Sequence, residues 1–237
     1  PTAPRTLDID AVQRLMPEQG IAPKAVIEGP PSRAVPILLR QTSFKALEEP
    51  VSYSDGTTTV AGSHTARFGE IEQRGIALTP KGQALYDKLL SQTRDIVRPA
   101  ADGSNAAEYM ETLARVFEEF PDDVDTLRTQ GLGYFRYSAT GKASSDADLT
   151  LSPSELVAKG LLHADPIVYE DFLPVSAAGI FQSNLGDDAA HAFVANPNRD
   201  RFEADLGAPV VELHQRYAEA EAASIARARS VLGRAHA

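Results

Sequence analysis

Residues 62–75 have the sequence Gly-Ser-His-Thr-Ala-Arg-Phe-Gly-Glu-Ile-Glu-Gln-Arg-Gly, and this stretch decides the fold. In an extended strand, successive side chains point to opposite faces. His64, Glu70, Glu72 and Arg74 therefore share one face of the predicted strand. Such a face is unsuited to a purely apolar core, because buried charges need partners or a metal. On spacing alone, a solvated outer strand with ion pairs such as Glu72 with Arg74 is the more ordinary explanation.

The sequence before this strand predicts a helix followed by further strands. Apolar residues at helical spacing indicate a short amphipathic helix over residues 7–19, capped by Thr6 or Asp8. Residues 24–28 and 35–44 are strand candidates. Asp55-Gly56 is a hairpin signal that pairs Val51–Tyr53 with Thr58–Val60. The predicted order is helix, strand, strand, hairpin extension and strand.

The second half of the chain has mostly helical patterns. Thr79-Pro80 combines an N-cap residue with proline at the first helical position. No linker composition separates the halves, so we expect the second half to pack on the first. We expect helices over about 80–97, 105–120, 152–161 and 210–231, strands over 131–137 and 166–173, and mixed helix and turn over 187–206.

Composition excludes several functional classes. The net charge of −10 argues against a nucleic-acid partner, because no basic excess neutralises phosphates. The chain has no cysteine, so any metal must use His, Asp or Glu ligands. No apolar run approaches the roughly 18–20 residues of a membrane span, and the first twenty residues have no apolar signal-peptide region. We therefore expect a cytoplasmic protein, although a start at Pro1 also fits a processed chain or a fragment.

The strand at residues 68–74 resembles a known metal-binding strand. Phe68-x-Glu70-Ile71-x-Gln73-Arg74 is similar to the terminal strand of 4-hydroxyphenylpyruvate dioxygenase, whose pattern is Phe, any residue, Glu, two aliphatic residues, Gln and Arg. The glutamate of that pattern is an iron ligand, which implies the same role for Glu70. Glu72 replaces the second aliphatic residue here, so the choice between the two carboxylates stays open.

Four longer stretches resemble one family over nearly the whole chain. They are PRTLDID at 4–10, LRQTSFKAL at 39–47, the segment at 64–82, and YEDFLPVSAAGIFQSNL at 169–185. All four are similar to 2-oxoadipate dioxygenase/decarboxylase, also called hydroxyglutarate synthase, in the vicinal-oxygen-chelate superfamily.

The resemblance implies an α+β fold of the vicinal-oxygen-chelate type, a βαβββ half barrel with added helices. Residues 1–78 would form the metal-binding module, with its first strand upstream of Pro1. Residues 79–237 would be mostly helical decoration, with Tyr169–Leu185 returning to the pocket. The family's two histidine ligands would also precede Pro1, so the N-terminal part of the same protein is an expected partner. His64 is a poor substitute, since it lies roughly 20 Å along the strand from Glu70, and Glu170 and Asp171 are reserve metal candidates.

The same resemblance implies iron chemistry on a small acid. An Fe(II) ion held by two histidines and Glu70 would leave positions open for a 2-oxo diacid and O2. The expected reaction, in lysine breakdown, converts 2-oxoadipate and O2 to 2-hydroxyglutarate and CO2. Another 2-oxo acid is a further option. The alternative hypothesis is a scaffold with an incomplete metal site that acts as a binding or interaction module.

Five residues are predicted to contact the substrate. Val175 and Ser176 follow a predicted strand, where backbone amides and a hydroxyl can hold a carboxylate, although a tight structural turn explains the same sequence. Gln41 and Ser43 share one face of the strand beside the metal strand, opposite Arg40 and Thr42. Arg74 is able to bind a distal carboxylate through a bidentate pair, or to act as a structural ion-pair partner.

Overall fold

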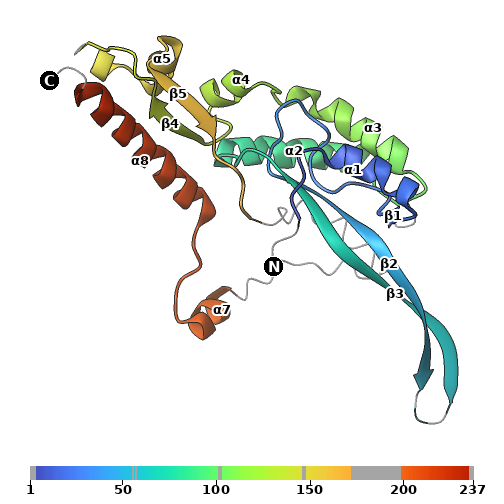
Figure 1. The fold of residues 1–237 in the computed structure, drawn as a ribbon. Helices are drawn as coiled ribbons and strands as arrows, with labels where there is room; N and C mark the ends of the chain where they lie inside the picture. Colours follow the sequence, from blue (N-terminus) through green and yellow to red (C-terminus); the bar gives the residue numbers. More distant parts are fainter. Residues whose placement is uncertain are drawn as a thin grey trace.

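The computed structural model describes residues 4–54, 56, 58–100, 103–145, 148–171 and 199–234, and within these ranges the side chains of residues 45–49, 63–69 and 202 are not described. The predicted α+β class is confirmed, since helices and antiparallel sheets are both present. The elements are α1 (Ile9–Leu15), β1 (Ala22–Pro23), β2 (Leu39–Ser54), β3 (Thr59–Arg74), α2 (Pro80–Ile96), α3 (Ala106–Val116), α4 (Val124–Thr129), β4 (Phe135–Ala139), α5 (Pro153–Ala158), β5 (Leu162–Pro166), α7 (Arg199–Leu206) and α8 (Leu213–Arg234), with 3-10 turns at Pro17–Gln19, Phe117–Glu119 and Asp148–Thr150 (Figure 1).

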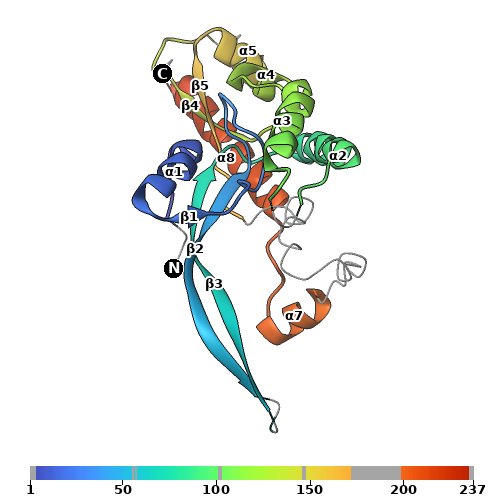
Figure 2. The same ribbon diagram turned by 90° about the vertical axis from the view of Figure 1, so that its right-hand side faces the viewer.

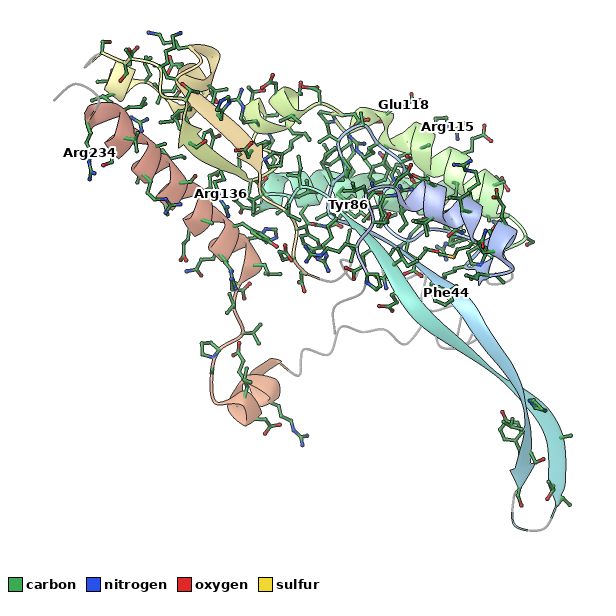
Figure 3. All side chains as sticks on the ribbon, in the orientation of Figure 1. Phe44, Tyr86, Arg115, Glu118, Arg136 and Arg234 are labelled. Atoms are coloured by element: carbon green, nitrogen blue, oxygen red, sulfur yellow. The ribbon has the colours of Figure 1, made fainter. Side chains whose placement is uncertain are left out.

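β2 and β3 form one long antiparallel hairpin that projects from the body of the molecule (Figure 1). The predicted hairpin is confirmed, because Tyr53 pairs with Val60 and the register continues inward until Leu39 pairs with Arg74. The register shifts beside Phe44, which Figure 3 labels where the hairpin leaves the body. Irregularities of this kind bend a strand and increase its twist.

The sheet is widened at both edges by short segments. On the β2 edge, β1 pairs with β2 and Glu28 bridges Gln41 in antiparallel fashion. On the β3 edge, Arg5 forms a parallel bridge to Glu72; the Thr6 amide donates to the Glu72 carbonyl at 2.8 Å, and the Glu72 amide donates to the Pro4 carbonyl at 2.9 Å. We expected a strand upstream of Pro1 to pair with the outer edge of β3. In the structure, Pro4–Thr6 takes this position beside β3.

Helix α1 covers one face of this sheet. Asp8 caps it by accepting from the Ala11 amide at 2.9 Å, and the helix is shorter than the predicted 7–19 because Pro17 begins a 3-10 turn. The Arg40 guanidinium donates to both Asp10 oxygens at 2.6 and 2.8 Å, and holds the pKa of that carboxyl below its usual range. The Thr42 hydroxyl donates to Gln13 at 2.6 Å. Arg40 and Thr42 therefore face α1, while Gln41 and Ser43 face the other way, as predicted.

Helices α2 and α3 pack on the opposite side of the sheet base from α1 (Figure 2). The predicted N-cap is confirmed, because the Thr79 hydroxyl accepts from the Gly82 amide at 3.1 Å. Tyr86 and Phe117 meet edge to face with ring centroids 5.4 Å apart. The apolar start of β2 lies in this same core, with Leu39 fully buried.

β4, β5, α5 and α8 form a second, smaller layer in which α8 lies along β4 (Figure 1). β4 pairs with β5, and two α8 side chains accept from the β4 backbone: Glu221 from the Phe135 amide at 2.8 Å and Ser224 from the Tyr137 amide at 2.9 Å. The outer edge of β4 is thus covered rather than open to strand pairing. Among the helices in the described part of the chain, none is long and apolar enough to cross a bilayer.

Of three further expectations for this half, one is confirmed, one needs adjustment and one lies partly outside the described residues. The Ser152 cap is confirmed, with a complete capping box at the start of α5. The strand predicted over 166–173 is displaced, because the regular ladder of β5 ends at Pro166. Between Ile167 and Asp171, the described residues that follow it, the one bridge joins Val168 to Ile76. Residues 187–198 of the predicted mixed segment lie outside the described residues.

The Tyr86 hydroxyl gives a test of this core. It is buried and has no hydrogen-bond partner among the residues that the structure describes, and burial raises the pKa of the phenol above its ordinary value. Replacing Tyr86 by Phe removes an unsatisfied polar group, so we expect the free energy of unfolding in urea to rise by about 1 kcal/mol. Tyr217→Phe is the control. The Tyr217 hydroxyl accepts from the Glu170 amide at 2.9 Å, so its removal should lower stability by a similar amount. An equal loss in both variants would contradict the account of Tyr86.

Candidate active site on the polar face of the sheet

The face of the sheet that points away from α1 carries two rows of polar residues. Directly paired residues on neighbouring strands present their side chains on the same face. Glu28, Gln41, Glu72 and Arg5 therefore form one row across the sheet, because each pairs with the next. Ser43 pairs with Glu70 in the adjacent row. We call the surface formed by Glu28, Gln41, Ser43, Glu70 and Glu72 the polar face.

The two carboxylates of β3 are in different situations. Glu72 is 5% exposed, and its Oε2 accepts from Arg74 Nε at 3.0 Å and lies 2.9 Å from Nη2 of the same guanidinium. Glu70 is exposed, and among the described residues its side chain has no hydrogen bond or ion pair. Glu70 is therefore the β3 carboxylate whose oxygens are available to a ligand, while Glu72 is committed to Arg74.

An exposed, uncommitted carboxylate fits one position of an iron site, because carboxylate oxygen is a normal ligand for such metals. Within the described ranges, no group of three His, Cys, Asp or Glu residues is arranged to hold a metal ion. The remaining ligands would thus have to come from elsewhere. The His64 backbone pairs with Glu49, well out along the hairpin from the Glu70–Ser43 pair, and its side chain lies outside the described side chains. Glu170 forms an ion pair with Arg5 at 2.8 Å.

Arg74 is held by protein groups on all three of its nitrogens. Besides its two contacts with Glu72, its Nη1 donates to the backbone carbonyls of Tyr169 and Asp171, each at 3.0 Å. A guanidinium engaged in this way has little capacity left for a substrate carboxylate. The geometry therefore supports the structural alternative for Arg74 rather than substrate contact.

Gln41 and Ser43 lie on one face of the strand that pairs with β3, as predicted. Ser43 is the direct cross-strand partner of Glu70, and Gln41 is buried one pair further along β2. Within the described part of the chain, the Gln41 side chain makes no hydrogen bond, so its amide is available to a bound molecule. Val175 and Ser176 lie outside the described residues, and of the Tyr169–Leu185 stretch the structure describes Tyr169, Glu170 and Asp171.

Glu28 is a residue of the polar face that the sequence analysis missed. It is 2% exposed, forms an ion pair with Lys24, and its Oε2 has no hydrogen-bond partner among the described residues. The available signal was a single charged residue at the end of the apolar run Ala25-Val26-Ile27, just before Gly29. A buried carboxylate with an unpaired oxygen is costly, and its place beside Gln41 makes it a candidate for polar contact within the site.

A cavity of about 310 Å³ lies elsewhere, on the α1 side of the sheet. It is lined by Asp10, Arg33 and Arg40, among other residues. Its charged groups already have partners: Arg40 binds Asp10, and Arg33 donates to the Phe120 and Pro121 carbonyls. This cavity is therefore separate from the polar face that carries Glu70.

Comparison with known proteins supplies the family. A model of the family 2-oxoadipate dioxygenase/decarboxylase matches residues 2–184. The 2-oxoadipate dioxygenase/decarboxylase of Pseudomonas putida is 57% identical over 225 residues, which cover 94% of this chain and 48% of that protein. The Escherichia coli K12 protein of the same name is 52% identical over 221 residues, covering 92% of this chain and 47% of the relative.

A solved structure agrees with these matches. The hydroxyglutarate synthase of Pseudomonas putida in complex with 2-oxoadipate superposes with a TM-score of 0.78 at 50% sequence identity, over 98% of this chain and 50% of that one. The chain thus spans about half the length of the curated relatives that it matches. As the resemblance of its motifs predicted, the chain belongs to the 2-oxoadipate dioxygenase/decarboxylase family.

Proposed function

We propose that the full-length protein, meaning this chain with any sequence that flanks it, is an Fe(II)-dependent enzyme of lysine breakdown in the cytoplasm. It converts 2-oxoadipate and O2 to 2-hydroxyglutarate and CO2. Family membership supports the reaction class, and the name of the solved relative bound to 2-oxoadipate supports the substrate. The observation that carries the proposal is the uncommitted Glu70 carboxylate at the motif's metal position on the polar face.

The sheet order supports a vicinal-oxygen-chelate half barrel. Pro4–Thr6 lies parallel to the inner part of β3, α1 follows it, and three antiparallel segments complete the sheet. This is a strand–helix–strand–strand–strand arrangement, with the first and last strands adjacent. In the proposed module the last strand carries the metal carboxylate, which agrees with Glu70 on β3.

Glu70 would hold the iron together with two histidines from the part of the protein before Pro1. When bound, Fe(II) supplies the redox chemistry that couples O2 to the loss of CO2 from a 2-oxo acid, and two histidines with one carboxylate leave positions open for both reactants. In the net reaction the keto carbon becomes a carboxyl group and the neighbouring carbon gains a hydroxyl, so that both oxygen atoms are accounted for.

The chain's own residues bind and orient the diacid. Gln41 and Ser43 lie beside Glu70 and offer hydrogen bonds to polar groups of the substrate. Val175 and Ser176 hold a substrate carboxylate through backbone amides and the serine hydroxyl. The buried Lys24–Glu28 pair lies on the β2 edge of the sheet, where Glu28 bridges Gln41. The pair has no net charge, so it does not repel the dianionic substrate.

An oxygen-electrode assay tests the reaction. The full-length protein with added Fe(II) should consume O2 in the presence of 2-oxoadipate, and chromatography should detect 2-hydroxyglutarate in equal amount. A metal chelator should abolish the uptake. Shorter and longer 2-oxo diacids show whether chain length matters. An absence of uptake with every 2-oxo diacid would contradict the proposal and favour the binding-module alternative.

Paired substitutions test the metal assignment. Glu70→Gln removes the ligand charge, and the fold should persist because Glu70 is exposed and makes no hydrogen bond or ion pair with the residues that the structure describes. We expect iron content, measured by metal analysis, to fall and turnover to be lost. Glu72→Gln, two residues away on the same face, should retain iron with at most a partial loss of activity. Because this variant leaves the buried Arg74 guanidinium without its carboxylate partner, the folded fraction of both variants is measured alongside iron content. If Glu70→Gln retains iron and Glu72→Gln loses it, the assignment of Glu70 as the metal ligand is wrong.

A further inference from the structure

We propose that Glu72 and Arg74 are positioning residues, which fasten the Tyr169–Asp171 segment to the strand that carries Glu70. This inference rests on the proposed function, because the positioned segment leads toward the proposed substrate ligands. We call Glu72, Arg74 and the carbonyls of Tyr169 and Asp171 the carbonyl clamp.

The clamp is built from one buried guanidinium. The Arg74 side chain is 11% exposed and that of Glu72 is 6% exposed. Glu72 engages the Nε and Nη2 edge of the guanidinium, while Nη1 points to the carbonyls of Tyr169 and Asp171 at 3.0 Å each. The guanidinium is a rigid planar fork, so fixing it on Glu72 also fixes where the two carbonyls must lie. Three residues of one segment are therefore set relative to β3.

Main-chain pairing places the same segment beside the end of β3. The Tyr169 amide donates to the Gly75 carbonyl at 2.9 Å, and the Ala77 amide donates to the Ile167 carbonyl at 2.8 Å. Gly75 itself passes so close to Pro36 that a Cβ at this position would lie 2.1 Å from the Pro36 carbonyl carbon. The backbone at the end of β3 thus has little freedom to shift, and Arg74, which directly precedes Gly75, is held in place with it.

Other contacts to the segment are weaker or come from outside the sheet. Arg5 donates to Glu170 at 2.8 Å, but both side chains are about half exposed, with values of 51% and 52%. Exposed ion pairs of this kind contribute little. The Tyr217 hydroxyl of α8 accepts from the Glu170 amide. Of these contacts to the Tyr169–Asp171 segment, the clamp is the one that is both buried and charge-assisted.

The clamp connects the two parts of the proposed site. Glu70 precedes Glu72 by two residues on β3, and Val175 and Ser176 follow Asp171 by four and five positions in the sequence. The clamp thus fixes Asp171, which precedes Val175 by four positions in the sequence, beside the strand that carries Glu70. Loosening the clamp should weaken substrate binding while the metal ligand itself stays in place.

The test compares Arg74→Lys with Arg5→Lys in the full-length protein. A lysine keeps the charge but loses the fork that contacts Glu72 and both carbonyls. We expect Arg74→Lys to raise KM for 2-oxoadipate about tenfold, with a smaller change in kcat and with iron content unchanged. Arg5→Lys alters the exposed ion pair to the same segment and should leave KM within about twofold of the wild type.

One further measurement and one further variant separate a failure of the clamp from a failure of folding or of the proposed function. Amide hydrogen exchange in a peptide that covers Ile167–Asp171 should become faster in Arg74→Lys and not in Arg5→Lys. If Arg74→Lys does not fold, the neutral pair Glu72→Gln with Arg74→Gln replaces it, since it leaves no unpaired buried charge. Unchanged KM and unchanged exchange overturn the clamp, and so does a loss of iron that parallels the loss of activity. If the wild-type protein shows no oxygen uptake, the proposed function and the positioning role are both overturned. Faster exchange in Arg74→Lys would in that case show that the clamp holds the segment but does not serve this reaction.

Discussion

The structure depends on the pairing register of β2 and β3. Gln41 lies opposite Glu72 and Ser43 lies opposite Glu70, which places these polar groups on one face and leaves Arg40 and Thr42 for α1. A slip of one residue would exchange the two faces of a strand. It would place Glu70 beneath α1, and it would move Glu72 and Arg74 together to that face, away from the Tyr169 and Asp171 carbonyls. The α1 contacts and the buried polar row both oppose such a slip, so the face that carries Glu70 is strongly specified.

Within that register, the two β3 carboxylates have separate tasks. Glu72 compensates the buried charge of Arg74, which in turn holds two carbonyls of a segment 95 and 97 residues away in sequence. Within the described part of the chain, no side chain or backbone group binds the Glu70 carboxylate. Burying a charge is costly unless it is paired, and the Glu72–Arg74 pair meets this cost without using the carboxylate that the proposed reaction needs. The glutamate that departs from the dioxygenase strand pattern therefore has a structural use.

Local signals in the sequence predicted much of this fold. Alternation and the Asp55-Gly56 turn predicted the hairpin, and Thr79 and Ser152 predicted two helix starts, because caps and turns depend on neighbouring residues. Long-range contacts were harder to predict. The edge segment Pro4–Thr6 and the buried Glu28 are defined by single bridges to distant strands. The role of Arg74 was left open between substrate and structural partners because two of its partners are main-chain carbonyls, which no sequence pattern marks. Alternation alone predicted that Gln41 and Ser43 share one face of their strand, whereas the register that sets Ser43 opposite Glu70 depends on long-range pairing that the sequence does not mark.

The most direct test of the account is to locate the metal in crystals of the full-length protein, with anomalous scattering recorded above and below the iron absorption edge. The account predicts one iron peak within bonding distance of a Glu70 carboxylate oxygen, on the polar face, with Glu72 still paired to Arg74. An iron peak bound by Glu72, or one remote from β3 with Glu70 unbound, would contradict it.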